Sequence, residues 1–451
     1  MRLNITKQNR RRIIVLVIIL EVLLVIGTLL AMWKKGSTTS LATSIILVML
    51  LLVPVLLVAL LCAVLFGKKR SDESGPAQLI LATDEEEEEA ETAERFCMLT
   101  RIEANRNRYG HATYNSDISL DAFCEQFRNF AADRLRLYYD IDDIRRFVAG
   151  MAVSKILILQ GMSGTGKTSL AHAFGEFVDN RSTVIPVQPM WKERTDLIGY
   201  YNEFTKRFNE TLLLEKMYEA NYSHDMYVTV LDEMNIARVE YYFAEFLSLL
   251  ELPNPEERYL AVVSDTWEND PAQLRDGRIK LPVNMWFIGT ANNDDSTFAI
   301  SDKVYDRAMV LDLDRKCERF VAPRTEPVAI SHEYFAEQVE AAIQEYAVSG
   351  RNRRRLQMLD EYLIAHFHIT FGNRIMKQIN TYIPVYIACG GDELVALDDI
   401  LAKKVIRKLE TQNPIYLRNA AEGLITYIDE LFGADHMNAC REAIRRLQRN
   451  A

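Results

Sequence analysis

Eight consecutive residues have the types and spacing needed to bind phosphate. Residues 161–168 fit the pattern Gly-x4-Gly-Lys-Thr, and they directly follow the apolar run 155–160. Glycines let backbone N–H groups wrap around phosphates where a strand leads into a helix, here expected over 168–178. The predicted nucleotide-binding residues of this P-loop are Gly161, Met162, Ser163, Gly164, Thr165, Gly166, Lys167, Thr168 and Ser169.

Two side chains of this loop have distinct expected tasks. Lys167 would reach the β- and γ-phosphates, and the Thr168 hydroxyl would complete the shell of a Mg²⁺ ion. The cofactors implied are therefore a nucleoside triphosphate and Mg²⁺.

A pair of acids follows a second apolar run. Residues 228–231 read as a buried strand that ends in Asp232 and Glu233. Asp232 is expected to hold Mg²⁺ through water, and Glu233 to orient and deprotonate the attacking water. The two acids could instead merely begin the next helix, but the strand before them and the P-loop upstream favour hydrolysis.

A third apolar run, 285–291, leads to an amide. Asn292 at its end could contact the γ-phosphate and the attacking water. Asn293 is equivalent on spacing alone, and either residue could be a simple turn residue.

Together these motifs resemble the McrB-type, dynein-related (MoxR-like) branch of the AAA+ ATPases, over roughly residues 141–410. The segments 191–202 and 243–250 are also similar to that family. The resemblance implies that Asn292 is the sensor-1 residue and that Arg307 is the arginine finger that reaches into a neighbouring subunit's site. Some relatives have consecutive arginines where this chain has Asp306 before Arg307. The predicted catalytic residues are Lys167, Glu233, Asn292 and Arg307.

The same resemblance suggests a role for Arg374. Arg374 is a candidate for the sensor-2 arginine, which binds nucleotide and couples it to the angle of a helical lid. The alternative is a surface ion pair.

The elements that must position these residues indicate an α/β fold. Strand and helix patterns alternate to about residue 313, and the chain is mostly helical from residue 331. We therefore expect an AAA+ P-loop core with a parallel sheet between helices over 117–320, and a lid with further C-terminal helices over 321–451.

The N-terminal part predicts a membrane anchor. The apolar runs 13–33 and 41–67 are each long enough for a transmembrane helix, giving a hairpin over 1–70. Basic residues flank both ends, so the N-terminus and the ATPase domain are expected in the cytoplasm, at a bacterial inner membrane. Residues 71–116 read as an acidic flexible linker.

Between residues 251 and 281 the sequence predicts an inserted hairpin. Arg275-Asp-Gly-Arg278 is a turn signal between short extended runs. In similar AAA+ proteins such an insertion points toward a central pore, so we hypothesise that it contacts the substrate.

Composition limits the classes of function. The net charge of −10 gives no support for nucleic-acid binding, and the six scattered cysteines form no CxxC or Cys/His metal motif. We expect a homo-oligomeric ring, a hexamer, that hydrolyses ATP, with GTP left open, and remodels or moves an unidentified protein partner. The alternatives are a slow nucleotide switch or scaffold, and a DNA translocase.

Overall fold

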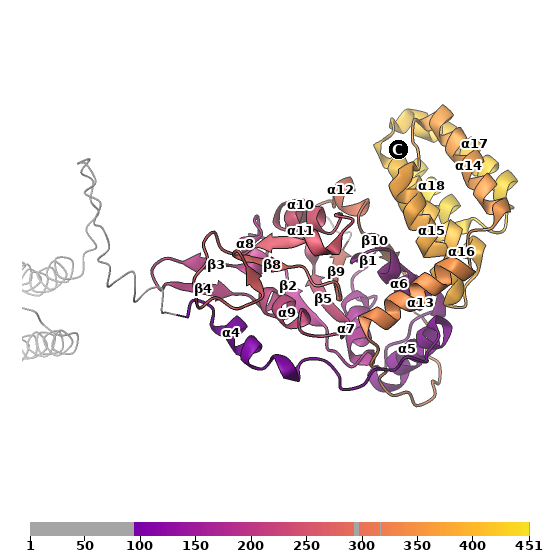
Figure 1. Ribbon diagram of the computed structural model, residues 1–451. Coiled ribbons are helices and arrows are strands. Elements are labelled where there is room, and N and C mark those ends of the chain that lie inside the picture. Colours follow the sequence, from indigo (N-terminus) through magenta and orange to yellow (C-terminus); the bar gives the residue numbers. More distant parts are fainter. Residues whose placement is uncertain (1–93, 293–296, 316, 451) are drawn as a thin grey trace, which may run out of the picture. The chain divides into compact units, whose positions relative to one another are not determined.

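The computed structural model describes residues 94–292, 297–315 and 317–450 (Figure 1). The chain divides into two units, 1–81 and 82–451, and every described residue lies in the second. The predicted spans 13–33 and 41–67, residues 71–93 of the predicted linker and Asn293 lie outside the described residues. The described remainder of that linker is partly ordered, since it includes the helix Cys97–Ala104, whose Leu99 and Ile102 are buried.

A parallel five-stranded sheet forms the centre of the described part. Its strand order is β10-β1-β9-β5-β2, with every neighbouring pair parallel. The register pairs Gly161 with Asn292 and Pro186 with Asp232, so the predicted motifs meet at the carboxyl edge. The strands are β1 (Ile156–Gly161), β2 (Thr183–Pro186), β5 (Tyr227–Asp232), β9 (Met285–Asn292) and β10 (Met309–Asp312).

The strands read as continuous apolar runs because both faces of the sheet are covered. Successive side chains alternate between the faces, so Leu157 and Leu159 join one hydrophobic core while Ile156 and Ile158 join the other. The sheet and the helices on both faces confirm the predicted α/β AAA+ fold with a parallel sheet.

Helices before and between the strands cover the two faces. Ser119 caps α5, accepting a hydrogen bond from Ala122 N at 3.3 Å, and the helix buries Phe123, Phe127 and Phe130. The helices up to β10 are α4 (Cys97–Ala104), α5 (Leu120–Leu135), α6 (Ile141–Val153), α7 (Lys167–Phe177), α8 (Thr195–Ile198), α9 (Leu212–Ala220), α10 (Val239–Tyr242), α11 (Ala244–Leu249) and α12 (Asp302–Tyr305), with 3-10 turns at Arg106–Arg108, Met234–Ile236 and Pro255–Glu257.

After β10 the described chain is helical, as predicted. Ser331 caps the first of these helices, accepting from Tyr334 N at 3.1 Å. The helices are α13 (His332–Glu345), α14 (Gly350–Phe367), α15 (Gly372–Ala388), α16 (Glu393–Lys404), a 3-10 turn at Ile406–Thr411, α17 (Pro414–Phe432) and α18 (Asn438–Asn450).

None of these helices could cross a membrane. Within residues 94–292, 297–315 and 317–450, no helix combines the necessary length with sufficient apolar character. Even the 19-residue α17 exposes Arg418, Glu422 and Glu430, because only one of its faces packs against the protein. This finding contradicts the predicted location at a bacterial inner membrane with a cytoplasmic ATPase domain.

Two small antiparallel sheets lie apart from the central one. The first pairs β3 (Gly199–Asn202) with β4 (Arg207–Glu210), and the second has the order β6-β8-β7. Its strands are β6 (Tyr259–Ala261), β7 (Leu274–Arg275) and β8 (Arg278–Lys280). Asp276 and Gly277 both have positive φ, 50° and 68°, as a tight two-residue hairpin turn requires. The predicted hairpin is confirmed.

Candidate functional site

The P-loop lies between the end of β1 and the start of α7. Gly164 and Gly166 have φ values of 78° and 91°, a region that favours glycine, and nothing lies within 4 Å of the place where a Gly164 Cβ would stand. Lys167 is only 7% exposed, and its Nζ donates to Gly161 O at 2.9 Å and Met162 O at 2.8 Å. The ammonium is thus held inside the curve of the loop.

The next feature is a hydroxyl–carboxylate pair at the carboxyl edge of the sheet. Thr168 Oγ1 donates to Asp232 Oδ1 at 2.7 Å, which joins the P-loop helix to the end of β5. Hydroxyl and carboxylate oxygens are the ligands that Mg²⁺ prefers, usually with several waters retained. These two residues therefore fit a hydrated Mg²⁺ ion bound together with nucleotide phosphates.

Thr290 organises both acids of the predicted pair, a role that we did not predict. Its Oγ1 donates to Asp232 Oδ1 at 2.8 Å and accepts from Glu233 N at 2.8 Å. Glu233 has an exposed side chain and a left-handed backbone, φ 52°, which is strained for a residue with a Cβ. The available signal was spacing, because Thr290 lies two residues before Asn292 on β9 and so shares its face.

Asn292 lies at the end of β9, beside the first residue of the P-loop. Its backbone oxygen accepts a hydrogen bond from Asn235 Nδ2 at 2.9 Å, and Asn235 is buried. β9 and the segment that follows the acidic pair are also tightly packed, since a Cβ on Gly289 would stand 1.9 Å from Met234 Sδ. The predicted Asp232, Glu233 and Asn292 are therefore brought together with Lys167 and Thr168.

Tyr139 is a second residue that the sequence analysis missed. It precedes α6, and its hydroxyl donates to Gly166 O at 3.1 Å. Burial raises the pKa of this phenol, so the hydroxyl keeps its proton and remains a donor. A lone tyrosine 27 positions before Gly166 carries no sequence signal for this contact.

Arg307 lies near the amino ends of the strands, at the edge of the sheet opposite the P-loop. Ser154 Oγ, just before β1, donates to Arg307 O at 2.7 Å. The P-loop begins at the other end of β1, and six residues of strand span about 20 Å. Arg307 thus lies far from the phosphate loop of its own chain.

Arg374 lies near Arg307 and away from the P-loop. Both arginines contact Glu251, with Arg307 Nη2 at 2.6 Å from one carboxylate oxygen and Arg374 on the other. The Arg307 hydrogen bond is the main reason that the pKa of Glu251 falls below its ordinary value. In this structure Arg374 has the alternative role considered above, an ion pair.

A cavity of about 860 Å³ opens around Glu251, Arg307 and Arg374. Its lining is rich in cations, and Glu251 is its one acid among the described lining residues. Further lining residues include Lys155, Arg258, Trp286, Lys377 and Gln378.

Comparisons with known proteins found one matching family. Residues 156–308 match an AAA domain of the dynein-related subfamily. Among solved structures, the chain is similar to a full-length MCM homolog from Methanopyrus kandleri, with 10% sequence identity and a TM-score of 0.33. The alignment covers 65% of this chain and spans 56% of that one. No curated protein matches the sequence.

The matched region runs from the first strand residue before the P-loop to the residue after Arg307, and so includes every predicted site residue except Arg374. The chain therefore contains an AAA+ ATPase-type domain of the dynein-related subfamily, a class of domain that hydrolyses nucleotide.

Proposed function

We propose that this protein hydrolyses ATP with Mg²⁺ at sites shared between copies of the chain in a ring, and that it uses the energy to remodel a protein partner. Within the dynein-related subfamily we assign it to the McrB-type, MoxR-like branch. The observation that carries the proposal is the separation of Lys167 and Arg307 along β1. One chain offers a phosphate loop at one edge of its sheet and an arginine at the other.

The chemistry follows from the contacts at the carboxyl edge. Bound nucleotide with Mg²⁺ supplies the phosphoryl group and the metal charge. Lys167 would neutralise phosphate oxygens, while Thr168 and Asp232 would hold the hydrated ion. Glu233, fixed through its N–H to Thr290, takes the proton of the attacking water, and Asn292 orients that water.

Arg307 would complete the neighbouring site by stabilising charge in the transition state. The helical region holds the backbone around it firmly. Lys404 Nζ donates to Tyr305 O at 2.8 Å and to Ala308 O, and Gln378 Nε2 donates to Asp306 O at 3.1 Å. Movement of α15 or α16 would therefore move the arginine.

Mixing two inactive variants tests the shared site. Lys167→Ala keeps Arg307, and Arg307→Ala keeps the P-loop, so each alone should lose about 100-fold or more of the hydrolysis rate. A mixture should recover activity, because some interfaces then join an intact loop to an intact arginine. ATP and GTP are assayed in parallel, with Glu233→Gln as the inactive control. A mixture no more active than its components would exclude the shared site.

A protein partner is supported by an exposed aromatic residue. Phe204 is fully exposed in the turn between β3 and β4, where burial by a partner would remove apolar surface from water. That hairpin contacts the 251–281 insertion through Tyr201 and Trp267, whose rings lie 6.0 Å apart. Phe204→Ser should abolish remodelling and leave basal hydrolysis intact. If Phe204→Ser keeps both remodelling and hydrolysis, this surface has no part in the proposed function.

A slow nucleotide switch is the second candidate, and Glu251 favours it. In the single chain Glu251 already engages Arg307, so turnover could wait for a partner that breaks this ion pair. Glu251→Gln separates the two functions by its effect on hydrolysis. A rise of several-fold indicates a held switch, whereas an unchanged or lower rate supports the constitutive ring.

A further inference from the structure

Two similar tripeptides face each other away from the nucleotide site. Ser223-His224-Asp225 precedes β5, and Ser331-His332-Glu333 begins α13. Asp225 and Ser331 pair as an isolated antiparallel bridge, and His332 N donates to His224 O at 2.9 Å. The backbone therefore brings the two imidazoles side by side, with ring centroids 6.3 Å apart and nearly parallel planes.

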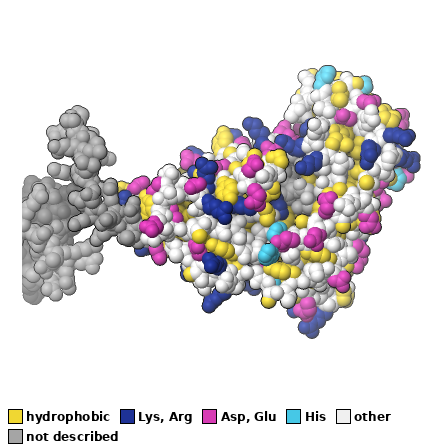
Figure 2. Space-filling model, in the orientation of Figure 1, with side chains coloured by type: hydrophobic (Ala, Val, Ile, Leu, Met, Phe, Trp, Pro, Cys, Tyr) yellow, Lys and Arg dark blue, Asp and Glu magenta, His cyan; other side chains and the backbone are white. Residues whose placement is uncertain are grey.

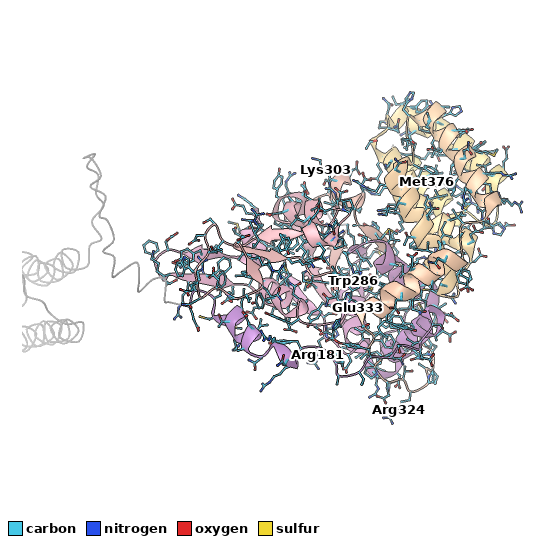
Figure 3. The ribbon with its side chains drawn as sticks, viewed as in Figure 1. Arg181, Trp286, Lys303, Arg324, Glu333 and Met376 are labelled. Atoms are coloured by element: carbon cyan, nitrogen blue, oxygen red, sulfur yellow. The ribbon has the colours of Figure 1, made fainter. Side chains whose placement is uncertain are left out.

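Glu333 adds a carboxylate to this pair. Its Oε1 lies 2.5 Å from His224 Nδ1, and its Oε2 lies 3.0 Å from His332 Nδ1. One ligand atom from each of the three residues lies within 4.8 Å of the other two. Figure 3 labels Glu333 at the start of α13, near Trp286, and Figure 2 shows histidine beside acidic side chains on this face.

One atom of the cluster lacks a hydrogen bond among the described residues. Glu333 Oε2 is buried and accepts none, although His332 Nδ1 is close to it. Buried polar atoms without partners are uncommon, and an ion can supply the missing contact.

We propose that His224, His332 and Glu333 bind a divalent transition-metal ion of the Zn²⁺ class. Two imidazole nitrogens with one carboxylate suit Zn²⁺ or Co²⁺, whereas Mg²⁺ and Ca²⁺ prefer oxygen ligands. A tetrahedral zinc site needs ligand atoms roughly 3.3 Å apart, and one ligand atom from each of these residues already lies within 4.8 Å of the other two. With three ligands from the described residues, a fourth position is left for water.

The ion would fasten α13 to the α/β core. His224 lies three residues before β5, the strand that ends in Asp232, while His332 and Glu333 open α13. Phe335 of α13 packs against Trp286 of β9, with ring centroids 5.9 Å apart. A metal bond at this junction would stabilise the contact between the sheet and the helices that follow it.

Binding is measured on the full-length, tag-free chain after chelator dialysis and without nucleotide. Zn²⁺ is titrated calorimetrically, and Co²⁺ by its visible absorption. We expect one ion per chain, a tetrahedral Co²⁺ band, and a melting temperature that rises by about 4 °C at saturating Zn²⁺. Failure to bind Zn²⁺ at micromolar concentrations, or equal binding of Mg²⁺, would refute the site.

The variants test which residues bind the ion. His224 is largely exposed, so His224→Ala should fold normally while weakening Zn²⁺ binding more than about 10-fold and removing the Co²⁺ band. His436→Ala, at another exposed histidine, is the matched control and should bind as the wild type does. Unchanged affinity in His224→Ala would assign the ion to other ligands and overturn the proposal.

Discussion

At the scale of single residues, the candidate site depends on a few hydroxyl groups as much as on its charges. Thr168 and Thr290 both donate to one oxygen of Asp232, and Thr290 also accepts from the backbone of Glu233. The Asp232 carboxylate and the Glu233 backbone are therefore held in place before any nucleotide or ion arrives, which favours electrostatic stabilisation without reorganisation.

Thr290→Val should lower the hydrolysis rate by about 10-fold or more and raise the Mg²⁺ concentration needed for half-maximal activity. The substitution removes both hydrogen bonds while nearly preserving shape, so Asp232 and Glu233 lose their common partner. Steady-state hydrolysis across a Mg²⁺ titration measures this effect.

Thr229→Val on the neighbouring strand β5 is the matched control. The Thr229 hydroxyl is buried without a hydrogen bond among the described residues, so its loss should leave hydrolysis unchanged and stability unchanged or higher. Equal rates in the two variants would show that Thr290 has no positioning role.

At the scale of elements, a buried arginine fixes the 251–281 insertion. Arg95, whose side chain is 1% exposed, contacts Asp270 at 2.6 Å and Asp265 at 3.1 Å, and lies over the Trp267 ring. Deleting residues 267–278 to test for substrate contact would leave Arg95 buried without Asp270, so point substitutions in the exposed turn are the better test.

Asp270→Ala should cost about 3 kcal/mol of unfolding free energy, because it removes the buried partner of a buried charge. Asp265→Ala removes a partner whose side chain is 59% exposed and should cost less than about 1 kcal/mol. Denaturant unfolding of the two variants measures the difference. Equal costs would mean that Asp270 is not the anchor.

The contact of α16 with the Arg307 segment should depend on pH. Burial lowers the pKa of Lys404 to about 7, so the folded protein holds this proton less tightly than the unfolded chain. Above pH 7, until the unfolded lysine also titrates, unfolding takes up a proton and the unfolding free energy rises with pH. The slope is up to about 1.4 kcal/mol per unit.

Lys404→Met lacks this proton, so the stability difference between wild type and variant should grow in favour of the wild type from pH 7 to pH 9. Denaturant unfolding at each pH measures it. A difference that does not change with pH would mean that Lys404 stays charged in the folded protein.

At the scale of the whole molecule, the two halves of the proposed site lie at opposite edges of one sheet, so the shared site that we propose needs a second copy of the chain. Specific hydrolytic activity should therefore fall as the protein is diluted below the concentration at which copies associate. Activity and light scattering are measured over the same dilution series. A specific activity that stays constant while the protein is monomeric would exclude a shared site.

The sequence by itself determined the α/β class, the P-loop, the acidic pair and the strand that ends in Asn292, because these depend on local patterns. Apolar runs form buried strands, glycines permit the loop, and polar residues at strand ends meet where parallel strands end together. The cap at Ser119 and the hairpin at Asp276 and Gly277 are equally local.

Only the tertiary structure decided which distant residues meet. The contact of Tyr139 with Gly166 depends on where α6 begins beside the P-loop, and that of Thr290 with both acids depends on the register of β9. The position of Glu251 between two arginines depends on how α15 packs, and no local pattern encodes any of these. The same holds for Arg374, which a motif alone assigned to nucleotide. The position of Arg374 follows from long-range packing, which is determined only when the whole fold forms.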